Sequence, residues 1–228
     1  MTLPRAPAAV VFDMDGLLFD TERLYEEAAL AAAARIGCEM DSAFFRTTLG
    51  SPWVVNRRLL LDRYGPAFAA DELRDAAALI FDELIGRQPL LKPGVLEVLD
   101  LLDGLGLPRA IATTSSHATV QRHIDAHGLQ GRFHHVVAHG DYLRHKPAPD
   151  PFLLAAERLG VAPENCVALE DSHNGIRAAS AAGMMTVMVP DLLPATEEIR
   201  ALCAHVARDL REVCRMIEAG RARGAVAR

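Results

Sequence analysis

Two aspartates separated by one residue, Asp13 and Asp15, follow a short apolar run near the start of this 228-residue chain. An aspartate carboxylate can attack phosphorus and form an aspartyl-phosphate, which splits one difficult displacement into two easier steps. A second carboxylate two positions later can protonate the departing oxygen and then take a proton from the attacking water. Asp13 is therefore the candidate nucleophile, and Asp15 is the candidate general acid and base.

Polar or charged residues also follow three later apolar runs of the chain. They are Thr113 with Thr114, Lys146, and Glu170 with Asp171. A lysine ammonium and a threonine hydroxyl can hold phosphoryl oxygens, the lysine as a compact charge and the threonine as a hydrogen-bond donor. Such groups neutralise the charge that develops during phosphoryl transfer. We therefore expect Thr113 and Lys146 to bind phosphate.

Four of these residues carry carboxylates, namely Asp13, Asp15, Glu170 and Asp171. If they meet at one site, they repel one another strongly unless protons or a cation neutralise them. A site that offers only oxygen ligands favours Mg²⁺. We therefore expect Mg²⁺ as the cofactor.

These residues can meet only if the strands that precede them end at a common edge. Short, mostly apolar runs that are typical of buried strands occur at 8–12, 109–112, 136–138, 166–169 and 186–189. Helical patterns alternate with them, and Asp150 is expected to cap one helix, with Pro151 in its first turn. This alternation predicts an α/β fold with a doubly wound parallel sheet, in which ligands bind beyond the carboxyl ends of the strands.

Residues 18–87 show helical periodicity and no strand pattern. Asp20 or Thr21 can cap a first helix through Ala34, and a second helix is expected between Leu73 and Leu84. Because the segment lies between the first strand and the next, it is predicted to be an inserted helical cap domain. Residues 1–17 and 88–228 are then expected to form the Rossmann-like catalytic core.

The order and spacing of Asp13-Met14-Asp15-Gly16, Thr113, Lys146-Pro147 and Glu170-Asp171 resemble the four motifs of the haloacid dehalogenase superfamily. Longer stretches also match, namely DMDGLLFDTE at 13–22, KPAPDPF at 146–152 and LEDSHNGIRAASAAGM at 169–184. The resemblance covers nearly the whole chain. It is closest to the subgroup that contains β-phosphoglucomutase, phosphoglycolate phosphatase and pseudouridine-5'-phosphatase.

This resemblance implies a phosphatase that hydrolyses a small phosphorylated metabolite, such as a sugar phosphate, phosphoglycolate or a nucleotide-like ester. It implies that Asp13, the backbone carbonyl of Asp15, and Asp171 bind Mg²⁺, that Glu170 supports the metal site, and that the cap closes over the substrate. It also selects Thr113 over Thr114 as the principal phosphate-binding hydroxyl. Thr114 and Ser115 are then expected to add further donors.

A sugar-phosphate mutase is the main alternative, because β-phosphoglucomutase belongs to the same subgroup. Sequences of that type carry a histidine near the start of the first cap helix, where this chain has Tyr25, and a K-G-x-x-R pattern where this chain has 49–53. A phosphoacceptor signalling module is a more distant alternative. The inserted cap and the second aspartate both argue against it.

The charge of the chain argues against two classes of binding partner, nucleic acids and membranes. The net charge of −6 provides no basic field for nucleic acid or an anionic membrane.

The first residues fit neither a signal peptide nor a membrane span, so a cytoplasmic location is expected. The four cysteines form no C-x-x-C pair and are expected to be reduced. We expect a monomer or a weak dimer.

Overall fold

The computed structural model describes residues 3–49, 51, 53–85 and 91–226. The chain divides into two compact units, one formed by Met1–Phe19 with Leu91–Arg228 and the other by Asp20–Leu90. We call them the sheet unit and the helical unit. Among the helices described, none has the length and apolar composition needed to cross a membrane.

The sheet unit contains six parallel strands in the order β3-β2-β1-β4-β5-β6. The strands are β1 (Ala9–Phe12), β2 (Arg109–Ser116), β3 (His135–His139), β4 (Cys166–Glu170), β5 (Met185–Met188) and β6 (His205–Val206). The chain moves outward in one direction from β1 to β3 and in the other from β4 to β6. This reversal confirms the predicted doubly wound α/β sheet.

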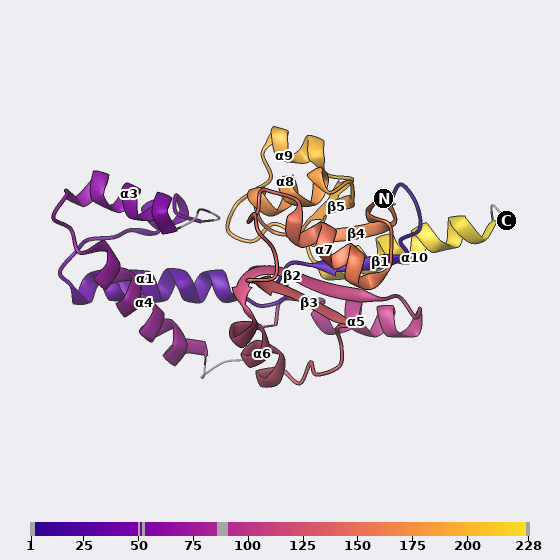
Figure 1. Ribbon diagram of the computed structural model, residues 1–228, viewed down its shortest axis with the longest axis horizontal. Helices are drawn as coiled ribbons and strands as arrows, with labels where there is room; N and C mark the ends of the chain where they lie inside the picture. The colour runs from indigo at the N-terminus through magenta and orange to yellow at the C-terminus, as the bar shows by residue number, and fades with distance from the viewer. Residues whose placement is uncertain (1–2, 50, 52, 86–90, 227–228) are drawn as a thin grey trace. The chain divides into compact units, whose positions relative to one another are not determined.

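Helices cover both faces of this sheet (Figure 1). Val10 and Phe12 face α5 (Val95–Gly104), α6 (His117–Ala126) and α10 (Leu210–Val226), whereas Ala9 and Val11 face α7 (Asp150–Leu159) and α8 (His173–Ala181). A shorter helix, α9 (Glu197–Leu202), packs through Ile199 near the end of β5. Because both faces are buried, the central strands are apolar at successive positions rather than at every second one.

Two local predictions are corrected by the structure. Asp150 does not cap α7, because Pro149 occupies the N-cap position and the Asp150 carboxylate accepts hydrogen bonds from the Arg144 backbone N–H (3.1 Å) and guanidinium (2.8 Å). Pro151 does lie in the first turn, as expected. The strand predicted at 109–112 continues through Ser116, with a register shift against β3 between Ala112 and Ser116.

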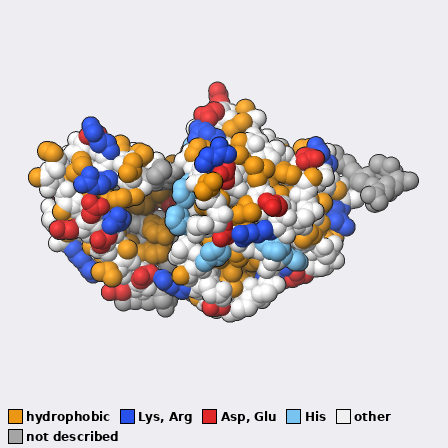
Figure 2. All heavy atoms as spheres, viewed as in Figure 1, with side chains coloured by type: hydrophobic (Ala, Val, Ile, Leu, Met, Phe, Trp, Pro, Cys, Tyr) orange, Lys and Arg blue, Asp and Glu red, His pale blue; other side chains and the backbone are white. Residues whose placement is uncertain are grey.

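The helical unit contains α1 (Thr21–Arg35), α2 (Ser42–Arg46), α3 (Trp53–Tyr64) and α4 (Ala70–Ile85), and no strand lies among its described residues. Asp20 occupies the N-cap position of α1 without a capping hydrogen bond from its side chain. Apolar side chains of α1 and α4 form its core, in which the rings of Tyr25 and Phe81 stack with their centroids 3.8 Å apart. Acidic and basic side chains are interspersed on its visible surface (Figure 2).

The turn from β4 to α8 is closed by the side chain of Glu170. Its Oε2 accepts hydrogen bonds from the Ser172 N–H and hydroxyl, both at 2.9 Å, and the Ser172 hydroxyl in turn accepts from the Gly175 N–H at 3.1 Å. A Cβ atom on Gly175 would lie only 1.7 Å from Glu170 Oε1. The buried carboxylate therefore requires a glycine at this point of the helix.

We expect Gly175→Ala to lower the free energy of unfolding by about 2 kcal/mol or more, because the buried carboxylate cannot move aside without losing its donors. Gly104→Ala is the matched control, since Gly104 is also helical but a Cβ atom added there would meet nothing within 4 Å. That variant should be neutral or stabilised by up to about 1 kcal/mol. Urea denaturation measures both values, and equal stability of the two variants would contradict the packing argument.

The junction of β6 and α10 is held by Glu212, which is 8 % exposed. Its Oε1 lies 2.9 Å from His205 Nε2, and its Oε2 accepts from the Arg208 N–H and guanidinium, both at 3.1 Å. The contact with His205, followed by those with Arg208, lowers the pKa of Glu212 to about 2 from an ordinary value of 4.5. The ionised carboxylate therefore stabilises the folded state.

A lowered pKa stabilises the fold above the ordinary value of 4.5, and this contribution is lost as the pH falls toward 2. We expect Glu212→Gln to lower the free energy of unfolding by about 2 kcal/mol at pH 7 and by progressively less below pH 4.5. Urea denaturation at several pH values measures the difference. Glu218→Gln, at an exposed position of the same helix, should remain within about 0.5 kcal/mol of the wild type. A deficit for Glu212→Gln that stays constant with pH would contradict this assignment.

Candidate active site

The predicted site residues lie at the carboxyl ends of adjacent strands. Asp13 directly follows β1, and its N–H donates to the Leu169 carbonyl of β4 at 2.9 Å. Glu170 is the last residue of β4, and Asp171 follows it. β1 and β4 are also the pair at which the sheet reverses direction, which is where open α/β sheets bind ligands.

Lys146 connects three neighbouring strands through its ammonium group. Nζ donates to Asp13 Oδ1 at 2.5 Å, to Glu170 Oε1 at 2.7 Å and to the Ala112 carbonyl of β2 at 2.9 Å. The Lys146 side chain is only 6 % exposed, and that of Glu170 is fully buried. All three N–H groups of the ammonium thus have acceptors, as a buried charge requires.

Burial and neighbouring charges act in opposite directions on the two central groups. Burial raises the pKa of Asp13 well above its ordinary value, Lys146 opposes this effect, and the Glu170 and Asp15 carboxylates add to it. Burial alone would lower the pKa of Lys146, but Asp13 and Glu170 together raise it above its ordinary value. Lys146 therefore favours the charged form, whereas burial disfavours the ionised form of Asp13.

A group of buried carboxylates suited to a cation lies beside Lys146. Oxygen atoms of Asp13, Glu170 and Asp171 lie within 4.8 Å of one another. Carboxylate oxygens are ligands that Mg²⁺ prefers, so this donor set fits the expected cofactor. Because Lys146 and Ser172 already occupy the two oxygens of Glu170, this residue suits a supporting role better than a direct one.

The Asp15 side chain lies outside this carboxylate group. Its Oδ2 accepts a hydrogen bond from the Ser115 hydroxyl at 2.7 Å. The metal contact expected of Asp15 involves its backbone carbonyl rather than this side chain. The following residue, Gly16, has φ of 81°, a left-handed conformation that favours glycine, and its N–H donates to the Phe19 carbonyl at 2.9 Å. The residues after this turn, Leu17 to Phe19, are buried in the core of the sheet unit.

The polar end of β2 brings the two threonines to the same edge of the sheet. Thr113 is buried, its hydroxyl accepts from the Ser115 N–H at 3.0 Å, and its carbonyl accepts from the Tyr142 hydroxyl at 2.9 Å. Thr114 is exposed. No sequence pattern indicates the contacts made by the Tyr142 and Ser115 hydroxyls, because their partners lie 29 and 100 positions away in the chain.

The two linkers to the helical unit pair with each other beside this site. The Lys92 N–H donates to the Leu18 carbonyl at 2.9 Å, and Phe19 and Leu91 form an antiparallel bridge. The Lys92 ammonium also lies 2.6 Å from the carboxylate of Asp191, in the segment after β5. The two points where the chain leaves and re-enters the sheet unit are therefore adjacent.

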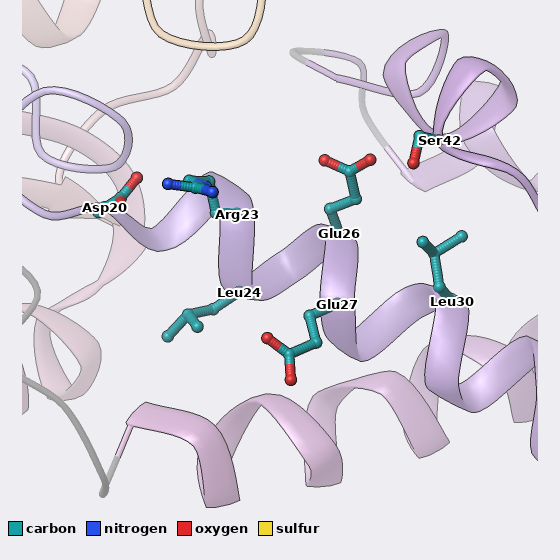
Figure 3. A pocket seen from close by; sticks show the side chains of 7 residues that line it. All are labelled: Asp20, Arg23, Leu24, Glu26, Glu27, Leu30 and Ser42. Atoms are coloured by element: carbon teal, nitrogen blue, oxygen red, sulfur yellow. The ribbon is translucent and has the colours of Figure 1, made fainter.

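The helical unit has an open pocket of its own. Its lining combines acidic, basic and apolar side chains from α1 and the start of α2 (Figure 3): Asp20, Arg23, Leu24, Glu26, Glu27, Leu30 and Ser42. None of the residues predicted for catalysis, phosphate or metal binding belongs to this pocket.

Comparison with known proteins agrees with this geometry. A family model described as haloacid dehalogenase-like hydrolase matches residues 7–183. A probable pseudouridine-5'-phosphatase from Drosophila melanogaster is 36 % identical, over 79 % of this chain and 80 % of its own length. A fructose-1-phosphate phosphatase from Escherichia coli is 34 % identical, over 80 % of this chain and 96 % of its own length.

A solved structure from Thermotoga maritima, described as a putative β-phosphoglucomutase, has the same fold. It superposes with a TM-score of 0.77, is 26 % identical, and covers 92 % of this chain and 98 % of its own. The strand order and the order of the four motifs agree with the family model, which matches most of the chain. The chain therefore belongs to the haloacid dehalogenase-like hydrolase family.

Proposed function

We propose that the protein is a Mg²⁺-dependent phosphatase that hydrolyses a small phosphorylated metabolite through an aspartyl-phosphate on Asp13. The observation that carries this proposal is the buried contact of Lys146 with Asp13 and Glu170, beside Asp171, at the reversal point of the sheet. Phosphoryl transfer needs a nucleophile that attacks phosphorus and positive charge that neutralises the phosphoryl oxygens. A carboxylate held by a buried lysine, next to further carboxylates that can bind a cation, suits both needs.

In the proposed reaction, Asp13 attacks phosphorus and the bond to the leaving oxygen breaks. Lys146 and the Thr113 hydroxyl hold the phosphoryl oxygens, with Thr114 as a further donor. Asp15 gives its proton to the leaving oxygen and, once ionised, takes a proton from the water that attacks the aspartyl-phosphate. Hydrolysis of this intermediate releases inorganic phosphate and regenerates the Asp13 carboxylate.

Asp13, the backbone carbonyl of Asp15, and Asp171 would hold the Mg²⁺ ion in this proposal, with Glu170 supporting them. The bound ion would supply the positive charge that an ionised Asp13 and a phosphate group require together. This role agrees with the raised pKa of Asp13, because Lys146 alone leaves that carboxylate hard to ionise. The helical unit is proposed to act as the cap that selects the substrate.

The substrate is proposed to be a phosphate ester of a sugar or a similar small metabolite. The two relatives are named as a fructose-1-phosphate phosphatase and a probable pseudouridine-5'-phosphatase. Hydrolysis is favoured over a mutase reaction because Tyr25, at the position of the mutase histidine, is stacked on Phe81 in the core of the helical unit. A cytoplasmic enzyme is the corresponding expectation.

Replacement of the nucleophile tests the mechanism. We expect Asp13→Asn to lower the rate of phosphate release by at least about a thousandfold, because an amide oxygen cannot form the covalent intermediate. The measurement is a Mg²⁺-dependent phosphate-release screen over sugar phosphates, phosphoglycolate and nucleotides. Asp62→Asn, at an exposed position paired with Arg58, is the control and should retain full activity.

Two results would contradict the proposal. The first is a wild-type protein that releases no phosphate from any compound in the screen, and the second is an Asp13→Asn variant as active as the wild type. Product analysis with β-glucose 1-phosphate distinguishes hydrolysis from isomerisation. Free glucose with inorganic phosphate is expected, whereas glucose 6-phosphate would identify the mutase alternative.

Metal removal tests the cofactor separately. We expect chelation with EDTA to abolish phosphate release and excess Mg²⁺ to restore it. Asp171→Asn should raise the Mg²⁺ concentration for half-maximal activity about tenfold or more, because one anionic ligand is lost. Titration of the chelated protein with Mg²⁺ measures this value. Full activity in EDTA would show that the carboxylates act without a metal.

A further inference from the structure

The Ser115 hydroxyl contacts the carboxylate that is proposed to move protons. Ser115 Oγ donates to Asp15 Oδ2 at 2.7 Å, although the two residues lie 100 positions apart in the chain. Both side chains are only partly exposed. At this distance the hydrogen bond is short, so the contact restrains the orientation of the Asp15 side chain.

Ser115 is itself held on both sides. Its N–H donates to the buried Thr113 hydroxyl at 3.0 Å. The next residue, Ser116, caps α6 by accepting from the Thr119 N–H at 3.2 Å. The Ser115 hydroxyl is therefore presented from the last residues of β2, which lead directly into α6, so little backbone entropy is lost when it contacts Asp15.

A hydroxyl suits both protonation states of Asp15. It donates to the ionised carboxylate, and it can accept from the carboxylic acid once Asp15 carries a proton. Ser115 can therefore keep its contact before and after Asp15 gives up its proton. An ammonium group at this position would instead favour only the ionised form.

We propose that Ser115 is a positioning residue that holds the Asp15 carboxyl for proton transfer to the leaving oxygen. The inference rests on the proposed phosphatase function and adds a role for a residue outside the four family motifs. Ser115 acts through Asp15 rather than on the phosphoryl group. Its removal should therefore slow formation of the aspartyl-phosphate only for esters whose leaving oxygen needs a proton.

Esters with different leaving groups provide the test. Fructose 1-phosphate and glycerol 3-phosphate release alkoxide oxygens that need a proton, whereas 4-nitrophenyl phosphate releases a stable phenolate that does not. We expect Ser115→Ala to lower kcat/KM about tenfold for the alkyl esters and less than about twofold for 4-nitrophenyl phosphate. The value of kcat/KM covers the steps through formation of the aspartyl-phosphate, so later hydrolysis of this intermediate does not obscure the comparison.

Three further variants separate positioning from structure. Ser115→Thr keeps the hydroxyl and should retain most of the activity on alkyl esters, and Ser115→Cys, with its weaker donor, should be intermediate. Ser116→Ala removes the neighbouring hydroxyl and the cap of α6, so it should lower thermal stability but leave the ratio of alkyl to aryl activity unchanged. If Ser115→Ala does not fold, Ser115→Cys provides the same comparison.

Equal losses on alkyl and aryl esters, or no loss on either, would overturn the role of Ser115 while leaving the phosphatase proposal intact. A wild type active on 4-nitrophenyl phosphate but on no alkyl ester of the earlier screen would overturn the acid role of Asp15 and this inference with it. A wild type that releases no phosphate from these esters or from any compound of that screen would instead overturn the proposed function itself. These outcomes distinguish failure of the Ser115 role from failure of the phosphatase function.

Discussion

The buried ammonium of Lys146 is the interaction on which the site depends. It contacts Asp13 after β1, Glu170 at the end of β4 and a backbone carbonyl of β2, so one charge joins three neighbouring strands. Isolated carboxylates would not remain ionised at this depth, and an isolated lysine would lose its proton. Each charge is tolerable only because the others are present. The single charge of Lys146 cannot balance the carboxylates of Asp13, Glu170 and Asp171, and a divalent cation would supply the missing positive charge.

The parallel sheet explains how residues more than a hundred positions apart meet. Parallel strands all end at one edge, and the reversal between β1 and β4 separates the following loops there. Glu170 connects this edge to the fold behind it, because its second oxygen is bonded to Ser172 and its carboxylate packs against Gly175. The carboxylate that contacts Lys146 and the start of α8 therefore form a single packed structure. Chemistry and stability are coupled at this position.

The strands and the convergence of Asp13, Lys146 and Glu170 were predictable, because apolar runs that end in charged residues are visible locally. Other features were not visible in this way. The polar segment 113–116 does not resemble a strand although it extends β2, and β6 has only two residues. Aspartate is a typical N-cap residue, but the carboxylate of Asp150 pairs with Arg144 instead. The contact between Ser115 and Asp15 depends on side-chain orientations across 100 residues, which no local pattern encodes.

The paired linkers at Leu18 and Lys92 have an evolutionary consequence. Because the chain leaves and re-enters the sheet unit at neighbouring points, the 71 residues from Asp20 to Leu90 form an excursion whose length and sequence do not affect the register of the strands. A lineage can therefore lengthen, shorten or replace this excursion while inheriting the carboxylates and the lysine unchanged. If the helical unit selects the substrate as proposed, a new substrate would require changes in this excursion alone.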